Sequence, residues 1–270
     1  MVQEIASTVN DVQRHQSKFR SLNLPHPTEN SELRTQLTKW GMLENMKWCC
    51  FGYDKPYHKM QGEDFLMDFL NDPVVRNELQ ILTKGGEWKK LEETITSVEC
   101  EMIPTTATSM ALFDKLAKSD PIVVRPGGEI VQCMEGFIDG FQICDLLRDL
   151  LLNECSENAD LFDESEKSEF LFAMLRHFCL GGAINQFENS IEAYIETIKK
   201  TYKTLVSAHK NKETDKVEIR SAVYKVKAAT TGQGKLDLFP EENLNSYMYI
   251  TFDPLKRTCW AWYHAFVSYW

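Results

Sequence analysis

Apolar residues recur at steps of three and four between residues 154 and 211, which is the strongest helical pattern in the chain. Asp163 stands three residues before Glu166, the spacing of a capping box, and the first apolar face ends at Gly181-Gly182. That face carries Phe170, Leu171, Met174, Leu175 and Phe178, and a second face carries Ile184, Phe187, Ile191, Tyr194, Ile195, Ile198, Tyr202, Leu205 and Val206. The pattern predicts two helices joined by the glycine pair as a buried αα-hairpin.

Shorter patterns on both sides predict a mixture of helices and strands. We expect helices from Ser31 to Gly41, over 62–70 and over 142–152, and a strand over 47–53. One or two strands are expected within 88–103, where a helix is the alternative. A loop is expected over 228–246, and a β-hairpin formed by 247–252 and 259–267. Helices and hairpins that occur separately, without a repeating βαβ order, are typical of the α+β class.

These elements predict a single α+β globular domain over 31–270, with a central helical hairpin and antiparallel strands. A candidate subdivision lies near 154–160, between the two halves of the pattern. Residues 1–30 are polar and weakly patterned, so we expect a loosely ordered N-terminal arm there.

Composition narrows the function by exclusion. Hydrophobic residues make up 43% of the 270 positions, too many for a disordered chain. The formal charge of −10 argues against nucleic-acid and membrane partners, which depend on Lys and Arg. The longest apolar stretch, Phe170 to Ile184, is interrupted by Arg176 and His177 and is too short to span a bilayer. The first residues resemble no secretory signal, and the eight cysteines follow no framework spacing, so we expect a soluble protein of a reducing, intracellular compartment.

The motifs that would carry chemistry are missing. Residues 231–235 (TGQGK) lack the first glycine of a P-loop, and the chain contains no GxGxxG, HExxH or GxSxG pattern. His177 lies on the apolar side of its helix and is more typical of a hydrogen-bonded core histidine than of a catalyst. We therefore expect no catalytic residue, cofactor or metal site, although a spatial triad leaves no sequence trace. A small-molecule enzyme or ligand-binding domain remains an alternative, which a deep pocket with perturbed ionisable groups would favour.

Two surface features are candidates for protein contact. Charge is uneven, with a local −6 over 154–169 and a local +6 over 199–227, which indicates either solvated helix ends or a dipolar surface that steers charged partners. In the last hairpin, aromatic side chains alternate onto one face, where they either close the core or form a contact patch. The candidate contact residues are Trp260, Trp262, Phe266, Lys199, Lys200, Lys203, Lys210 and Lys212.

The stretch 170–183 (FLFAMLRHFCLGGA) resembles a hallmark of the cilia- and flagella-associated protein 300 family. The likeness continues through 186–188, 194–197, 202–207 and 221–226, upstream through 40–43, 51–54 and 64–67, and near the end through 252–257 and 263–264. It spans roughly residues 17–265, is strongest over 170–226, and leaves out the N-terminal arm and the Trp-rich ending.

This resemblance implies a non-enzymatic protein needed for the assembly of outer and inner dynein arms, and hence for ciliary motility. It implies a cytoplasmic preassembly or transport factor that is also found in the cilium or flagellum. The implied partners are a co-chaperone of Kintoun type and axonemal dynein subunits. The family offers no catalytic residues to carry over, and a resident structural component of the axoneme is the alternative.

Overall fold

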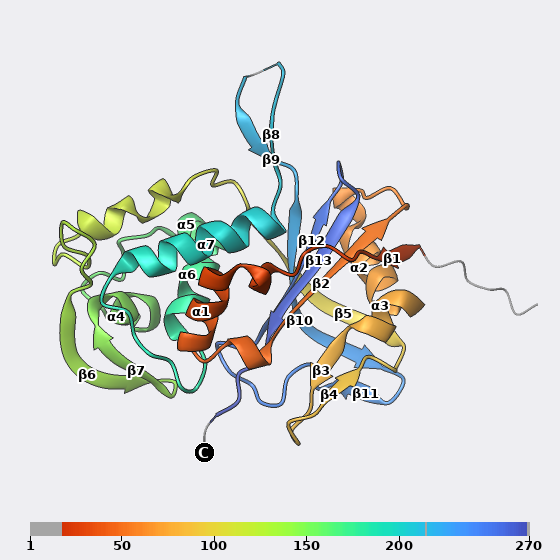
Figure 1. Ribbon diagram of the computed structural model, residues 1–270, viewed down its shortest axis with the longest axis horizontal. Coiled ribbons are helices and arrows are strands. Elements are labelled where there is room, and N and C mark those ends of the chain that lie inside the picture. Colours follow the sequence, from red (N-terminus) through yellow and green to blue (C-terminus); the bar gives the residue numbers. More distant parts are fainter. Residues whose placement is uncertain (1–17, 214, 269–270) are drawn as a thin grey trace, which may run out of the picture.

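An antiparallel sheet forms the centre of the computed structural model, which describes residues 18–213 and 215–268 (Figure 1). Its strands follow the spatial order β1 (Phe19–Ser21), β2 (Met46–Tyr53), β13 (Thr258–His264), β12 (Tyr247–Asp253), β10 (Ala222–Thr231) and β11 (Gly234–Leu236). A seventh strand, β5 (Ile95–Ile103), pairs along β10, and every pairing in the sheet is antiparallel. Strands that are distant in sequence, such as β2 and β13, therefore lie side by side.

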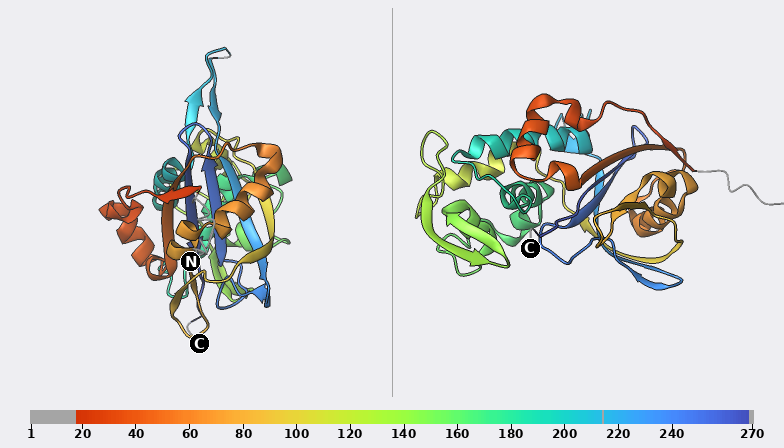
Figure 2. Two further views of the ribbon diagram at one scale, coloured as in Figure 1. Left: turned by 90° about the vertical axis from the view of Figure 1, so that its right-hand side faces the viewer. Right: turned by 60° about the horizontal axis from the view of Figure 1, so that its bottom comes forward.

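Helices cover both faces of this sheet (Figure 2). On one face lie α1 (Ser31–Lys39), α6 (Phe170–Leu180) and α7 (Ile191–Leu205), and on the other lie α2 (Gly62–Asn71) and α3 (Pro73–Glu78). Each face has its own apolar cluster, so that Tyr249 packs toward α6 whereas Phe252 packs toward α2. Because both sides are covered, every residue of β12 is buried.

Smaller elements surround these layers. They are α4 (Leu146–Leu152), α5 (Glu164–Ser168), the hairpins β3 (Gln80–Leu82) with β4 (Trp88–Lys90), β6 (Gln132–Ile138) with β7 (Phe141–Asp145), and β8 (Ala208–Lys210) with β9 (Val217–Ile219), and the 3-10 helices η1 (Pro27–Glu29), η2 (Leu43–Asn45), η3 (Lys59–Gln61) and η4 (Met110–Ala117). The β8–β9 hairpin projects away from the body (Figure 1). Side chains around η4 and α4 belong to the same apolar cluster as α6 and α7, so this region packs on the main core.

The predicted α+β class is confirmed, and so are several elements close to their predicted bounds. Helices α1 and α2, strands β2 and β5, and the hairpin of β12 and β13 lie where the pattern places them. The capping box is also confirmed, because Asp163 accepts from the Glu166 amide while the Glu166 side chain accepts from the Asp163 amide. These features depend on local spacing alone.

The predicted helical hairpin differs in its details. The first helix is divided at Glu169, whose backbone is extended, and its buried carboxylate accepts hydrogen bonds from Thr106. The second helix begins at Ile191 rather than at 184, so residues 181–190 connect α6 and α7. The two helices still pack against each other on the sheet.

Three other predictions are wrong in part. Residues 141–145 form a strand instead of a helical turn, and the predicted loop over 228–246 contains the end of β10 and all of β11. Within the predicted loose arm, residues 1–17 lie outside the described residues, but β1 adds an edge strand to β2. Phe19 in that strand is 2% exposed and packs on Phe65 and Phe69, which gives the edge strand its own apolar anchor.

The glycine pair after α6 permits a close contact between two backbones. Gly181 has a φ of +63°, and the Gly182 amide donates to the carbonyl of Trp40 at 2.8 Å. A Cβ on Gly182 would lie 2.1 Å from the carbonyl oxygen of Gly41, so no other residue fits without moving the backbone. The contact joins the end of α1 to the end of α6.

A buried cation connects α4, α6 and α7. Arg148 is 1% exposed, forms an ion pair with Asp145, and donates to the Cys179 carbonyl at 2.9 Å and to the Tyr194 hydroxyl at 3.0 Å. Its guanidinium also lies 3.8 Å from the centre of the Phe187 ring. Every part of the charge therefore has a partner, as a buried cation requires.

Candidate functional site

The aromatic residues of the last hairpin belong mainly to the core. Trp262 is fully buried, its ring 4.7 Å from that of Tyr247 and 5.4 Å from that of Trp48, so the prediction of an accessible contact at Trp262 is wrong. The reason is that helices cover both faces of β13. Trp260 and Phe266 are half-buried, and Phe266 packs on Phe141 at 5.4 Å.

The predicted basic residues lie on the surface of α7 and of the β8–β9 hairpin. Lys199 and Lys200 form ion pairs with Glu196 and Glu32, and Lys210 pairs with Asp215 at 2.6 Å. Lys212 is exposed in the turn between β8 and β9, and Lys203 is exposed on α7 with no ion pair in the part of the chain that the structure describes. Their role as contact residues stays a prediction.

Three lysines line a depression of about 630 Å³ between α7 and the strand β8. This basic groove is formed by Lys199, Lys203 and Lys256, over an apolar floor of Met110, Tyr202, Val206 and Ile219. Lys256 donates to the hydroxyl of Ser207 at 2.7 Å, which holds its ammonium at the edge of the groove. An apolar floor with cations at its rim suits an acidic, amphipathic segment of another protein.

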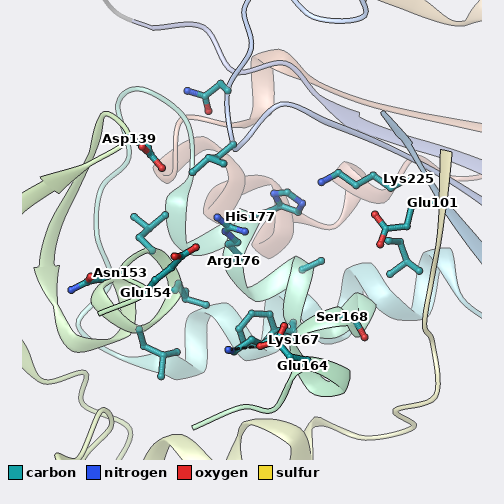
Figure 3. Close-up of a pocket in the computed structure, with 18 of the residues that line it drawn as sticks. Glu101, Asp139, Asn153, Glu154, Glu164, Lys167, Ser168, Arg176, His177 and Lys225 are labelled. Atoms are coloured by element: carbon teal, nitrogen blue, oxygen red, sulfur yellow. Dashed lines mark hydrogen bonds and ion pairs between the residues drawn. The ribbon is translucent and has the colours of Figure 1, made fainter. Parts of the chain in front are cut away.

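A larger cavity of about 950 Å³ lies between α6, α4 and the sheet (Figure 3). This main cavity has Arg176 and Lys225 on its inner wall, an apolar side that includes Leu150 and Phe172, and acidic residues around it. The acidic residues are Glu101, Asp139, Glu154, Asp160, Glu164 and Glu242. Acidic residues of the segment 154–169 therefore lie at the same cavity as Lys225, the one member of the basic segment 199–227 that lines it.

Two cations of the main cavity have no ionic partner within residues 18–213 and 215–268. Arg176 on α6 and Lys225 on β10 both point into the cavity in Figure 3, and neither forms an ion pair. The Nε of Arg176 is buried without a hydrogen bond. Burial lowers the pKa of Lys225, and the nearby Arg176 charge lowers it further.

His177 also borders the main cavity, but its ring is held in a closed network. The Asn245 side chain donates to the carbonyls of His177 and Gly181, so its oxygen accepts from Nδ1 of His177 at 2.7 Å. Nε2 then accepts from the Tyr249 hydroxyl at 2.9 Å. The ring is neutral because burial holds its pKa well below the ordinary value, which agrees with the core histidine that the sequence predicts.

The cysteine side chains form no disulfide bonds, and burial lowers the reactivity of the buried thiols. Burial raises the pKa of Cys49 to about 11, and that of Cys50 and Cys179 to about 12. Thiols with such values are protonated at neutral pH and are poor nucleophiles.

Among the described residues, no group of three His, Cys, Asp or Glu side chains comes close enough together to hold a metal ion. None of the helices formed by these residues is long and apolar enough to cross a membrane.

The sequence predicts the lysines of α7 as contact residues, which stays a prediction, and it does not identify the main cavity. In the sequence, Lys225 is one of the charges of the basic stretch 199–227, and Arg176 interrupts the apolar run from Phe170 to Ile184. A charged residue on an otherwise apolar helix face was the available signal, because such a residue needs a partner or a cavity.

Most of the chain is similar to proteins of one family. The family model described as "Cilia- and flagella-associated protein 300" matches residues 16–264. A protein of that name from Chlamydomonas reinhardtii is 41% identical over 93% of this chain and 99% of its own length, and one from Paramecium tetraurelia is 29% identical over 82% of both chains. No solved structure matches the chain.

Proposed function

The chain belongs to the cilia- and flagella-associated protein 300 family, and from this premise we propose that it acts in the cytoplasmic preassembly or transport of axonemal dynein arms. It is a cilium- or flagellum-associated protein by family. The observation that carries the proposal is the similarity over nearly the full length of the chain and of its Chlamydomonas relative. In this proposal the protein works by binding other polypeptides, transforms no substrate, and divides between cytoplasm and cilium.

The proposed partners are axonemal dynein subunits and a co-chaperone of Kintoun type. The basic groove is the proposed contact surface, because its lysines surround an apolar floor that a partner segment can cover. Lys203 carries a charge with no ion pair among the described residues, so a partner carboxylate gains a contact there without breaking an existing one. The chain as a whole is acidic, so a basic groove also selects the orientation in which an acidic segment approaches.

Affinity capture from the cytoplasm of ciliated cells tests this proposal. The expected result is recovery of dynein heavy or intermediate chains, or of the co-chaperone, with the wild-type protein. The charge-reversal variant Lys199→Glu, Lys203→Glu, Lys256→Glu should lose them. The control variant Lys59→Glu, Lys84→Glu, Lys118→Glu makes the same change in net charge at exposed positions outside the groove and should retain them.

Recovery of no dynein chain and no co-chaperone by the wild-type protein would contradict the proposed function. Equal recovery by both variants would contradict only the basic groove. Extraction of cilia with salt separates the remaining alternative, because an assembly factor stays with the soluble cell-body fraction whereas a resident axonemal component sediments with microtubules.

A further inference from the structure

The main cavity contains an electrostatic imbalance that the proposed protein contacts do not explain. Arg176 and Lys225 face one another across its inner wall, yet the acids nearby are engaged elsewhere or stand at the rim (Figure 3). Glu101 is the strand partner of Lys225, but its carboxylate pairs with Lys227 at 3.0 Å instead. Asp139 favours the charge of Arg176 and Glu101 that of Lys225, but neither acid forms an ion pair with these cations among the described residues. Two neighbouring cations that are partly removed from water without a contacting anion are costly.

The shape and lining of the cavity suit a small organic molecule. Its volume of about 950 Å³ lies within the range of ligand sites, roughly 300–1,000 Å³. Leu150, Phe172 and Ala173 provide an apolar wall beside the cations, so charge and hydrophobic contact are available to one ligand. His177 and Asn245 fix the position of Tyr249 at the base, which makes this part of the wall rigid.

We propose that the main cavity binds a small organic anion whose carboxylate or phosphate group lies between Arg176 and Lys225, with its apolar part against Leu150 and Phe172. Both anionic groups accept charge-assisted hydrogen bonds from guanidinium and ammonium donors. The ligand's anionic group would neutralise the charge of Arg176 as the Asp145 carboxylate neutralises that of the buried Arg148.

The rim sets a limit on the ligand's charge. Asp139, Glu154 and Asp160 have no ion pair in the described part of the chain and stand where the mouth of the cavity meets solvent. Their charges repel an extended polyanion, so the geometry favours an anion of one or two charges over a nucleoside triphosphate. This inference is independent of the dynein-arm proposal, which concerns a different surface.

Titration of the folded full-length protein with inorganic phosphate, succinate and ATP tests the inference. Reductive ¹³C-methylation of the lysines makes each ammonium visible by NMR, and Lys225 is assigned from the signal that is absent in Lys225→Gln. We expect phosphate or succinate to shift the Lys225 signal saturably, with a dissociation constant on the order of 1 mM. The pKa of Lys225 should rise on binding, because the anion favours the charged ammonium.

Two variants separate the site from non-specific charge. Arg176→Gln should weaken the probe that binds by about tenfold or more, since a charge-assisted hydrogen bond is lost. Arg176→Lys keeps a cation and should recover part of the affinity, and Lys84→Gln, remote from the cavity, should leave it unchanged. Far-UV circular dichroism and a denaturant titration establish that each variant is folded before it is compared.

Tighter binding of phosphate than of succinate supports a phosphate monoester, and the reverse supports a carboxylate. Absence of a saturable Lys225 shift with both probes would overturn the proposal, and so would an equal shift in Arg176→Gln. If ATP binds more tightly than either probe, the limit on charge is wrong.

Discussion

Replacement of Trp262 by alanine tests whether the aromatic hairpin face is core or contact surface. The side chain is fully buried, and its indole lies among the rings of Trp48, Tyr247 and Tyr249 at centroid distances of 4.7 to 5.7 Å. The indole N–H also points to the sulfur of Met46 at 3.3 Å. The substitution therefore removes the centre of a packed cluster and leaves a void between the sheet and α6.

The expected cost follows from burial. Truncation of a buried Trp or Phe to alanine lowers the free energy of unfolding by about 3–5 kcal/mol, from lost hydrophobic transfer and from the cavity left behind. For a chain of this size, 1 kcal/mol corresponds to roughly 2–4 °C in the melting temperature, so we expect a decrease of roughly 6–20 °C. Partner binding should fall only in proportion to the unfolded fraction.

Urea denaturation followed by far-UV circular dichroism measures this change, with partner capture carried out below the melting temperature of the variant. Trp260→Ala provides the matched control, because Trp260 is half-buried on the same strand face and should cost about half as much. The burial argument would be refuted if Trp262→Ala unfolded within about 1 kcal/mol of the wild type and yet lost its partners.

Three further changes test other parts of the fold by the same denaturation assay. Gly182→Ala should lower the free energy of unfolding by about 1–3 kcal/mol, because its Cβ would meet the Gly41 carbonyl. The control Gly232→Ala, where a Cβ meets open space, should change the free energy of unfolding by less than about 0.5 kcal/mol. Equal effects would contradict the close backbone contact. Arg148→Met should cost about 3–5 kcal/mol by leaving Asp145 buried without its cation, and adding Asp145→Asn should restore part of the loss; no recovery in the double variant would argue against the ion pair. Burial lowers the pKa of His264 to about 4 and that of His177 well below 6.5, so below pH 6.5 the unfolded state binds more protons than the folded state. As the pH falls, the free energy of unfolding should therefore decrease by up to about 1.4 kcal/mol per pH unit for each histidine. An unchanged urea midpoint between pH 7 and pH 5 would contradict this.

The helices and strands that the sequence predicts well are those defined by neighbouring residues. The capping box at Asp163 needs only a spacing of three, and the β12–β13 hairpin needs only alternation on either side of Asp253-Pro254. The errors occur where a distant contact competes with local preference. Glu169 divides the predicted helix because Thr106, from another part of the chain, provides donors for its carboxylate.

The apolar spacing over 142–152 illustrates a second limit. Ile143 and Leu147 fit a helical face, but Ile143 belongs to β7, where Phe141, Ile143 and Asp145 alternate inward. A short apolar run satisfies both periods, and only its pairing with β6 decides between them. The β1 strand is similar, since three residues contain no pattern until β2 provides the partner.

By itself, the sequence determined the fold class, the family and the positions of the basic residues on α7, because these depend on composition, local period and shared motifs. Tertiary structure alone decided that Trp262 is inside and that Arg176 and Lys225 share a cavity. Both outcomes depend on which elements pack together. Helices on both faces of the sheet bury Trp262, and the packing of α6 and α4 beside the sheet forms a cavity that no sequence motif marks.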